Sequence, residues 1–139
     1  MPVNIRELLP SNAELVCISY YALSAALLTA VPAAVTGILQ AGAVMNKTGD
    51  IYLEDKKTLK PKVKTLFTHA ALSDTVILIS TYYWWTRRKA GGASYEPETW
   101  MMLLSFLLSV VLLFAASFGA TLVYRHGAGM AVGKERKHS

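Results

Sequence analysis

Two ionisable residues, His69 and Asp74, interrupt an otherwise apolar stretch, "FTHAALSDTVILISTYYWWTRR", at residues 67–88. A histidine and a carboxylic acid in such surroundings could relay protons, ligate a haem iron or hydrogen-bond to a neighbouring helix. Because a charged group inside hydrocarbon is costly, both residues require a structural explanation. That explanation depends on the helices that carry them.

The chain contains three long apolar segments. Residues 15–46 and 99–124 carry no charged side chain, and residues 65–86 carry only Asp74. A membrane-spanning helix needs about 20 predominantly apolar residues. The sequence therefore predicts an all-α integral membrane bundle of three transmembrane helices, roughly 15–44, 66–87 and 99–124. The proline at position 32 predicts a kink in the first of them.

The composition also indicates a membrane protein. Hydrophobic residues make up 53% of the 139 residues and charged residues 17%, whereas soluble domains are about a quarter charged. The net charge of +5 fits basic loops at a membrane surface, so no nucleic-acid partner is predicted. A single cysteine, Cys17, excludes an internal disulfide.

The predicted organisation has three parts. Residues 1–14 resemble a linker, residues 15–126 form the transmembrane domain with a charged loop at 45–65, and residues 127–139 form a basic tail. We call the membrane face of the 45–65 loop side A and the opposite face side B. Ten of the 14 Lys and Arg residues fall on side A, which predicts that this loop and the C-terminus are cytosolic and the N-terminus is not. Asn46, in a glycosylation sequon, is therefore expected to be unmodified. The sequence does not indicate which organelle's membrane holds the protein.

Two further groups of residues have predicted structural roles. Small residues at four-residue spacing predict a close helix–helix contact, either within the chain or with a second copy or a partner helix. They are Ala33, Gly37 and Ala41. Aromatic and basic residues at side B are predicted to anchor the chain at the lipid headgroups. They are Trp84, Trp85, Arg87, Arg88 and Trp100.

Polar residues of all three helices are predicted to share one layer in the side A half of the membrane. Asp74 is expected about 12 Å inside, at ~1.5 Å per residue from Leu66. Since a lipid-facing acid would be unfavourable, the polar arc of the second helix is expected to face the other helices. The members of this polar intramembrane layer are His69, Ser73, Asp74, Thr36, Gln40, Ser117 and Thr121.

Three hypotheses fit this layer. The favoured one is a hydrogen-bond network that fixes helix packing in a non-enzymatic structural or accessory protein. A second is a haem b held by His69 and His126, for an electron-transfer subunit. The third is a proton or small-solute path through an oligomer, using Asp74 and His69. A Ser73–His69–Asp74 catalytic set is not favoured, because no oxyanion hole is indicated. We predict no catalytic or metal site.

Four segments carry a family resemblance: "SYYALSAALLTAVPAAVTG", "THAALSD", "YYWWTRR" and "TLVYRHGAGMAVG". In this order they resemble the fungal branch of the family of domain of unknown function 2231, which comprises predicted integral membrane proteins. The resemblance covers about residues 19–133 and implies a membrane bundle but no reaction. It also implies that an additional first helix with His-Pro motifs, typical of the family, has no counterpart here.

Overall fold

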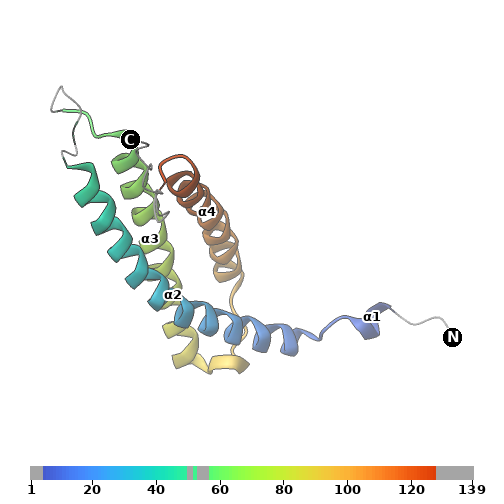
Figure 1. Ribbon diagram of the computed structural model, residues 1–139. Coiled ribbons are helices and arrows are strands. Elements are labelled where there is room, and N and C mark those ends of the chain that lie inside the picture. The colour runs from blue at the N-terminus through green and yellow to red at the C-terminus, as the bar shows by residue number, and fades with distance from the viewer. Residues whose placement is uncertain (1–4, 50–51, 53–56, 128–139) are drawn as a thin grey trace, which may run out of the picture.

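The computed structural model describes residues 5–49, 52 and 57–127, and they form helices almost throughout (Figure 1). The elements are α1 (Ile5–Leu8), α2 (Asn12–Thr48), α3 (Pro61–Ala90), a short 3-10 helix η1 (Gly92–Ser94) and α4 (Thr99–Tyr124). An isolated antiparallel bridge joins Tyr52 to Leu59. The predicted all-helical architecture is confirmed for this part of the chain, and the tail 128–139 lies outside the described residues.

Helix α2 begins at Asn12 because Ser11 caps it. The Ser11 hydroxyl accepts a hydrogen bond from the Glu14 backbone N–H at 3.3 Å, and the Glu14 carboxylate accepts one from the Ser11 N–H at 2.7 Å. This reciprocal capping box satisfies donors that have no partner within the helix. As a result, part of the segment predicted as a linker, residues 5–8 and 12–14, is helical.

The long helix α2 changes direction near its middle, and Pro32 lies in that part of the helix (Figure 1). Proline lacks the N–H that would bond to the carbonyl four residues earlier, so a bend there has a direct cause. The helix continues to Thr48, and the sequon residue Asn46 is therefore in its last turn rather than in a loop.

Helices α3 and α4 form an antiparallel hairpin (Figure 1). Helix α3 starts with Pro61 at its first position, where a missing N–H costs nothing, and ends at Gly91, whose φ of 137° is accessible to glycine. It is longer at both ends than the predicted 66–87, whereas α4 has the predicted bounds.

The seam between the hairpin helices repeats every seven residues. The buried residues of α4 are Met101, Leu108, Ala115 and Leu122. Val76 and Tyr83 of α3 are also buried and are seven residues apart. A seven-residue repeat keeps one face of a helix towards its partner, as in a coiled coil.

Two helices within the described residues, α2 and α4, are long and apolar enough to cross a membrane. Helix α3 is long enough but falls short in hydropathy, so the third predicted span is not shown. Its low hydropathy comes from lysines in its first turns, from the basic residues Arg87, Arg88 and Lys89 in its last turn, and from its many hydroxyl side chains.

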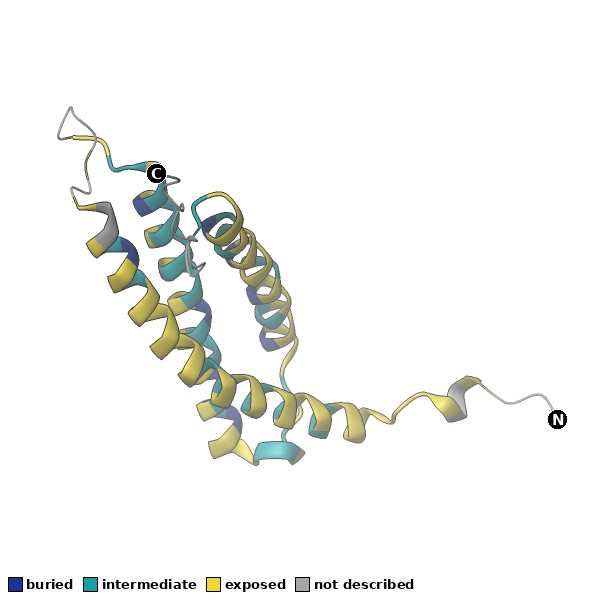
Figure 2. Ribbon diagram, viewed as in Figure 1, coloured by how far each residue is buried: buried dark blue, intermediate teal, exposed yellow. Residues whose placement is uncertain are grey.

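The apolar surface of this fold faces outwards. Figure 2 shows α2 exposed along most of its length, and none of its most apolar 18-residue window is buried, against 17% in α4. Large side chains such as Leu28, Ile38 and Phe106 are more than 70% exposed. A core helix of a soluble protein would show the opposite pattern.

Candidate functional site

His69 is the member of the predicted polar layer that reaches another helix. Its Nδ1 lies 2.7 Å from the carbonyl oxygen of Ala115 on α4, so a proton on Nδ1 makes the ring a donor. Gly119, one turn further along α4, provides room for the imidazole. A Cβ added there would lie 2.9 Å from His69 Cε1 and 3.3 Å from Nδ1. The ring is thus seated against the α4 backbone.

Three hydroxyl groups of the predicted layer bond to their own helices. Thr36 donates to the carbonyls of Pro32 and Ala33 at 3.0 Å, Ser117 donates to Phe114 at 2.7 Å, and Thr121 donates to Ser117 at 2.9 Å. Gln40 is exposed and Ser73 is partly buried. A hydroxyl three or four residues after a carbonyl can satisfy itself locally. Among the described residues, the predicted network across three helices is therefore reduced to the His69 contact.

Asp74 does not face the other helices of the chain, contrary to the prediction. Its side chain is exposed, whereas Val76, two residues later, is buried. Two residues correspond to about 200° of rotation around a helix, which places Asp74 nearly opposite the buried face. Among the polar side chains of α3, His69 contacts α4, whereas Asp74 is exposed.

The structure does not bring the two candidate haem ligands together. His69 contacts α4 at Ala115 and Gly119, and His126 follows Gly119 by seven residues, about 10 Å along a helical path. The imidazole of His69 is also engaged with a backbone carbonyl. That bond uses Nδ1 and is compatible with iron ligation through Nε2, so it does not count against the haem hypothesis. No described contact joins His69 to His126, and the structure therefore gives this hypothesis no support.

Of the three small residues predicted to pack against a helix, two are exposed and Ala41 is partly buried. Ala33 and Gly37 are exposed, and a Cβ on Gly37 would meet no atom within 4 Å. All residues from Val31 to Gln40 are exposed, and Val44 is buried. The described residues therefore leave this part of α2 open to a partner helix.

Arg87 is the most deeply buried polar residue in the described part of the chain. Only 1% of its surface is exposed, although the sequence predicted a headgroup-facing anchor. Its Nη1 donates to the Ser19 hydroxyl and its Nη2 to the Val16 carbonyl, both at 3.1 Å. The guanidinium also lies over the rings of Tyr20 and Tyr83, 5.5 and 5.7 Å from their centroids. Arg87 therefore ties α3 to the first turns of α2.

A second hydrogen bond supports the same contact between the helices. Trp84 Nε1 donates to the Ser24 hydroxyl at 2.8 Å, one and a half turns beyond Ser19 on α2. The sequence did not reveal these serines as partners, because a serine in an apolar helix usually bonds to its own backbone. Their alignment with Arg87 and Trp84 depends on how α2 crosses the hairpin.

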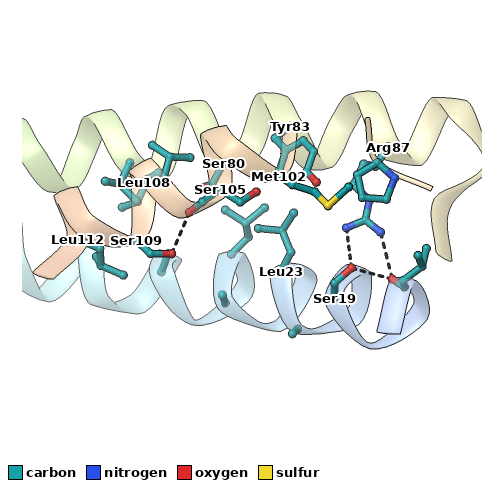
Figure 3. A pocket seen from close by; sticks show the side chains of 18 of the residues that line it. Ser19, Leu23, Ser80, Tyr83, Arg87, Met102, Ser105, Leu108, Ser109 and Leu112 are labelled. Atoms are coloured by element: carbon teal, nitrogen blue, oxygen red, sulfur yellow. Dashed lines mark hydrogen bonds between the residues drawn. The ribbon is translucent and has the colours of Figure 1, made fainter. Parts of the chain in front are cut away.

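An apolar groove of about 740 Å³ lies between α2, α3 and α4. Figure 3 shows Arg87 and Ser19 at one end, Leu108 and Leu112 at the other, and Leu23, Ser80 and Ser105 between them. Arg87 is the one charged residue among the described residues that line it. Sites for small molecules are typically apolar clefts of about 300–1,000 Å³ with few polar groups, and the groove has this character.

Aromatic and basic side chains surround the Arg87 end of the hairpin. The Arg88 guanidinium lies 5.1 Å from the ring centroid of Trp84, and Lys89 Nζ lies 5.2 Å from that of Trp85. Trp100 is exposed and donates to the Glu98 carboxylate at 2.6 Å. Such a girdle is typical of the headgroup region of a membrane, but the anchoring role of these residues stays a prediction.

Comparisons with known proteins address the identity of the chain. Curated proteins and solved structures gave no match. A family model described as "Predicted membrane protein (DUF2231)" matches residues 5–132, nearly the whole chain. This range includes the hairpin, α2 and the groove between them. The description of the family as membrane proteins agrees with the exposed apolar surfaces of α2 and α4. The chain therefore belongs to the DUF2231 family of predicted membrane proteins.

Proposed function

We propose that the protein is a non-enzymatic structural or accessory component of a membrane, which it crosses three times. The observation that carries this proposal is the outward apolar surface of α2 and α4. Leu28, Ile38, Phe106 and Leu113 are each more than 70% exposed and lie on long apolar helices. Exposed surface of this extent is stable when hydrocarbon surrounds it.

Helix α3 is the proposed third span because it accompanies α4 in the hairpin (Figure 1). With 30 residues it is about 45 Å long, enough to cross a bilayer. Its threonines at positions 65, 68, 75 and 81 each donate to a carbonyl of the preceding turn. Satisfied hydroxyl groups are much less costly in hydrocarbon than free ones.

The structural role is supported by what the polar side chains contact. His69 engages the α4 backbone, while Arg87 and Trp84 engage α2. Each of these contacts joins two helices, and interhelical hydrogen bonds of this kind stabilise membrane bundles without any ligand. A packing role accounts for all three residues without a ligand or cofactor.

Assembly with another membrane helix follows from two exposed features. Asp74 lies on the exposed face of α3, and residues 31–40 of α2 are all exposed in the described part of the chain. An acid facing lipid is unfavourable, and a small-residue face allows close helix approach. A second copy or a partner helix would cover these surfaces. The assignment to the fungal branch and the lack of an additional first helix also stay predictions.

Cysteine labelling tests whether α3, the third proposed span, crosses the membrane and in which orientation. In a Cys17→Ala background, Lys57→Cys reports side A and Ser94→Cys reports side B, labelled with an impermeant maleimide on intact cells and after permeabilisation. We expect Ser94→Cys and Lys57→Cys to react on opposite sides of the membrane, with Lys57→Cys on the cytosolic side. Labelling of both from the same side would show that α3 does not cross, and reversed labelling would overturn only the orientation.

A further inference from the structure

The groove beside Arg87 combines a buried cation with a long apolar surface, and this combination suits an amphiphile. Arg87 is 1% exposed, and no described residue forms an ion pair with it. Its Nε has no hydrogen-bond partner although it is buried. Removing a guanidinium from water without a counter-anion is costly, and neutral acceptors and two tyrosine rings offset only part of that cost. The site lacks one negative charge.

The length of the groove matches one leaflet of a bilayer. Along α3 it extends from Arg87 to Val76, about 16 Å at ~1.5 Å per residue. Half of a hydrocarbon core is about 15 Å thick. An acyl chain whose headgroup lies beside Arg87 would therefore fill the groove and end near the bilayer midplane, between Val76 and Leu112.

The surroundings of Arg87 place this end of the groove at headgroup level. Arg88, Lys89 and Trp85 are exposed on the same turn of α3, and Trp100 is exposed at the start of α4. Aromatic and basic residues favour the interface between hydrocarbon and water. The walls of the groove include small residues that leave room for an alkyl chain. They are Ala22, Ala26, Ala30, Ser105 and Ser109.

We propose that this groove is a binding site for an anionic glycerophospholipid, with its phosphate paired to Arg87 and one acyl chain lying between α2 and α4. The inference rests on the proposed membrane location. It adds a ligand with a defined headgroup charge, a defined leaflet (that of side B) and a one-to-one stoichiometry. Charge complementarity selects the anionic headgroup, while the apolar walls account for the chain.

The test uses the full chain purified in a neutral detergent and titrated with dioleoyl phosphatidylglycerol or dioleoyl phosphatidylcholine, followed by native mass spectrometry. We expect one phosphatidylglycerol bound per chain, with a Kd about tenfold or more below that of phosphatidylcholine. Both lipids carry a phosphate, but the choline cation of phosphatidylcholine cancels its charge, so only phosphatidylglycerol supplies the net negative charge that Arg87 lacks. Arg87→Gln should abolish this preference, and Arg88→Gln, the same charge change on an exposed neighbour, should leave it intact.

A second pair of variants separates lipid binding from helix packing. Ala26→Phe fills the groove without touching Arg87, and Ala25→Phe places the same ring on the adjacent residue, which does not line the groove. We expect Ala26→Phe to eliminate binding of both lipids and Ala25→Phe to leave it unchanged.

Equal Kd values for the two lipids in the wild type, a preference that survives Arg87→Gln, or binding that survives Ala26→Phe would each overturn the proposal. Oleate binding with no phosphatidylglycerol bound would overturn the phospholipid assignment. Loss of the lipid site alone would not affect the labelling pattern expected for three spans.

Discussion

At the scale of single residues, the contact of His69 with Gly119 explains how α3 and α4 approach one another. The imidazole bonds to the Ala115 carbonyl only because position 119 carries no side chain. Gly119 lies within a regular helix, so its backbone conformation does not require glycine. The volume of the neighbouring His69 ring does. Gly37 differs, because nothing lies within 4 Å of a Cβ at that position.

Gly119→Ala should destabilise the hairpin by about 1–3 kcal/mol, the usual cost of overpacking, because the added methyl group displaces His69. In a His69→Ala background the same change should be neutral or stabilising, since alanine favours a helix by about 1 kcal/mol over glycine. Unfolding of the four proteins of this double-mutant cycle in detergent provides the measurement. Gly37→Ala is the control and should be tolerated in either background. Additive effects at 119 and 69 would show that the ring does not contact this glycine.

At the scale of elements, α3 has two different faces. Val76, Tyr83 and Arg87 pack inwards, while Asp74 and Thr75 are exposed. The hydroxyl of Thr75 is satisfied by the Ala71 carbonyl at 2.7 Å, and no described residue bonds to the Asp74 carboxyl group. Asp74 thus differs from the threonines of α3, whose hydroxyl groups bond to their own helix. Asp74 is the residue that most opposes insertion of this helix.

Asp74→Leu should increase the inserted fraction of α3 in the full chain. Replacing aspartate by leucine near a helix centre is favourable by roughly 3–4 kcal/mol on insertion scales. Accessibility of Lys57→Cys and Ser94→Cys on opposite sides reports the inserted fraction. Thr75→Leu, on the adjacent residue, should change insertion much less because its hydroxyl is already bonded. Reduced insertion of Asp74→Leu would indicate that Asp74 is held by a polar partner in the membrane.

At the scale of the whole molecule, α2 is fastened to the hairpin in its N-terminal part, where Arg87 and Trp84 bond to it. Near its C-terminal end Val44 is buried. Between them lie the exposed residues 31–40 and the bend near Pro32. A molecule with so much apolar surface and so small a core is stable only within an amphiphilic environment.

The protein should stay with the membrane fraction at alkaline carbonate pH and should need detergent for solubility. Alkaline treatment removes peripheral proteins that bind by charge, whereas burial of α2 and α4 in hydrocarbon does not depend on pH. Immunoblots of pellet and supernatant give the readout, with a soluble protein as control. A monodisperse protein in detergent-free buffer would contradict both the proposed location and every depth assignment.

The all-helical class, the bounds of α4 and the membrane character were predictable from the sequence. They depend on long uncharged runs, whose effect on structure is local. The boundaries of α2 and α3 were less accurate, since the Ser11 capping box and Pro61 extend both helices beyond their apolar parts. Helix ends depend on single capping residues, which hydropathy does not detect.

Which polar residues meet depends instead on how the helices pack together. Depth in the membrane grouped His69 with Asp74, but the rotation of α3 against α4 turns the first inwards and the second outwards. Similarly, the sequence does not distinguish Arg87 from its exposed neighbour Arg88. In the folded chain, α2 contacts Arg87 and Arg87 is buried. A helix fixes the angle between its own side chains, whereas the direction in which a given face points is set by packing between helices.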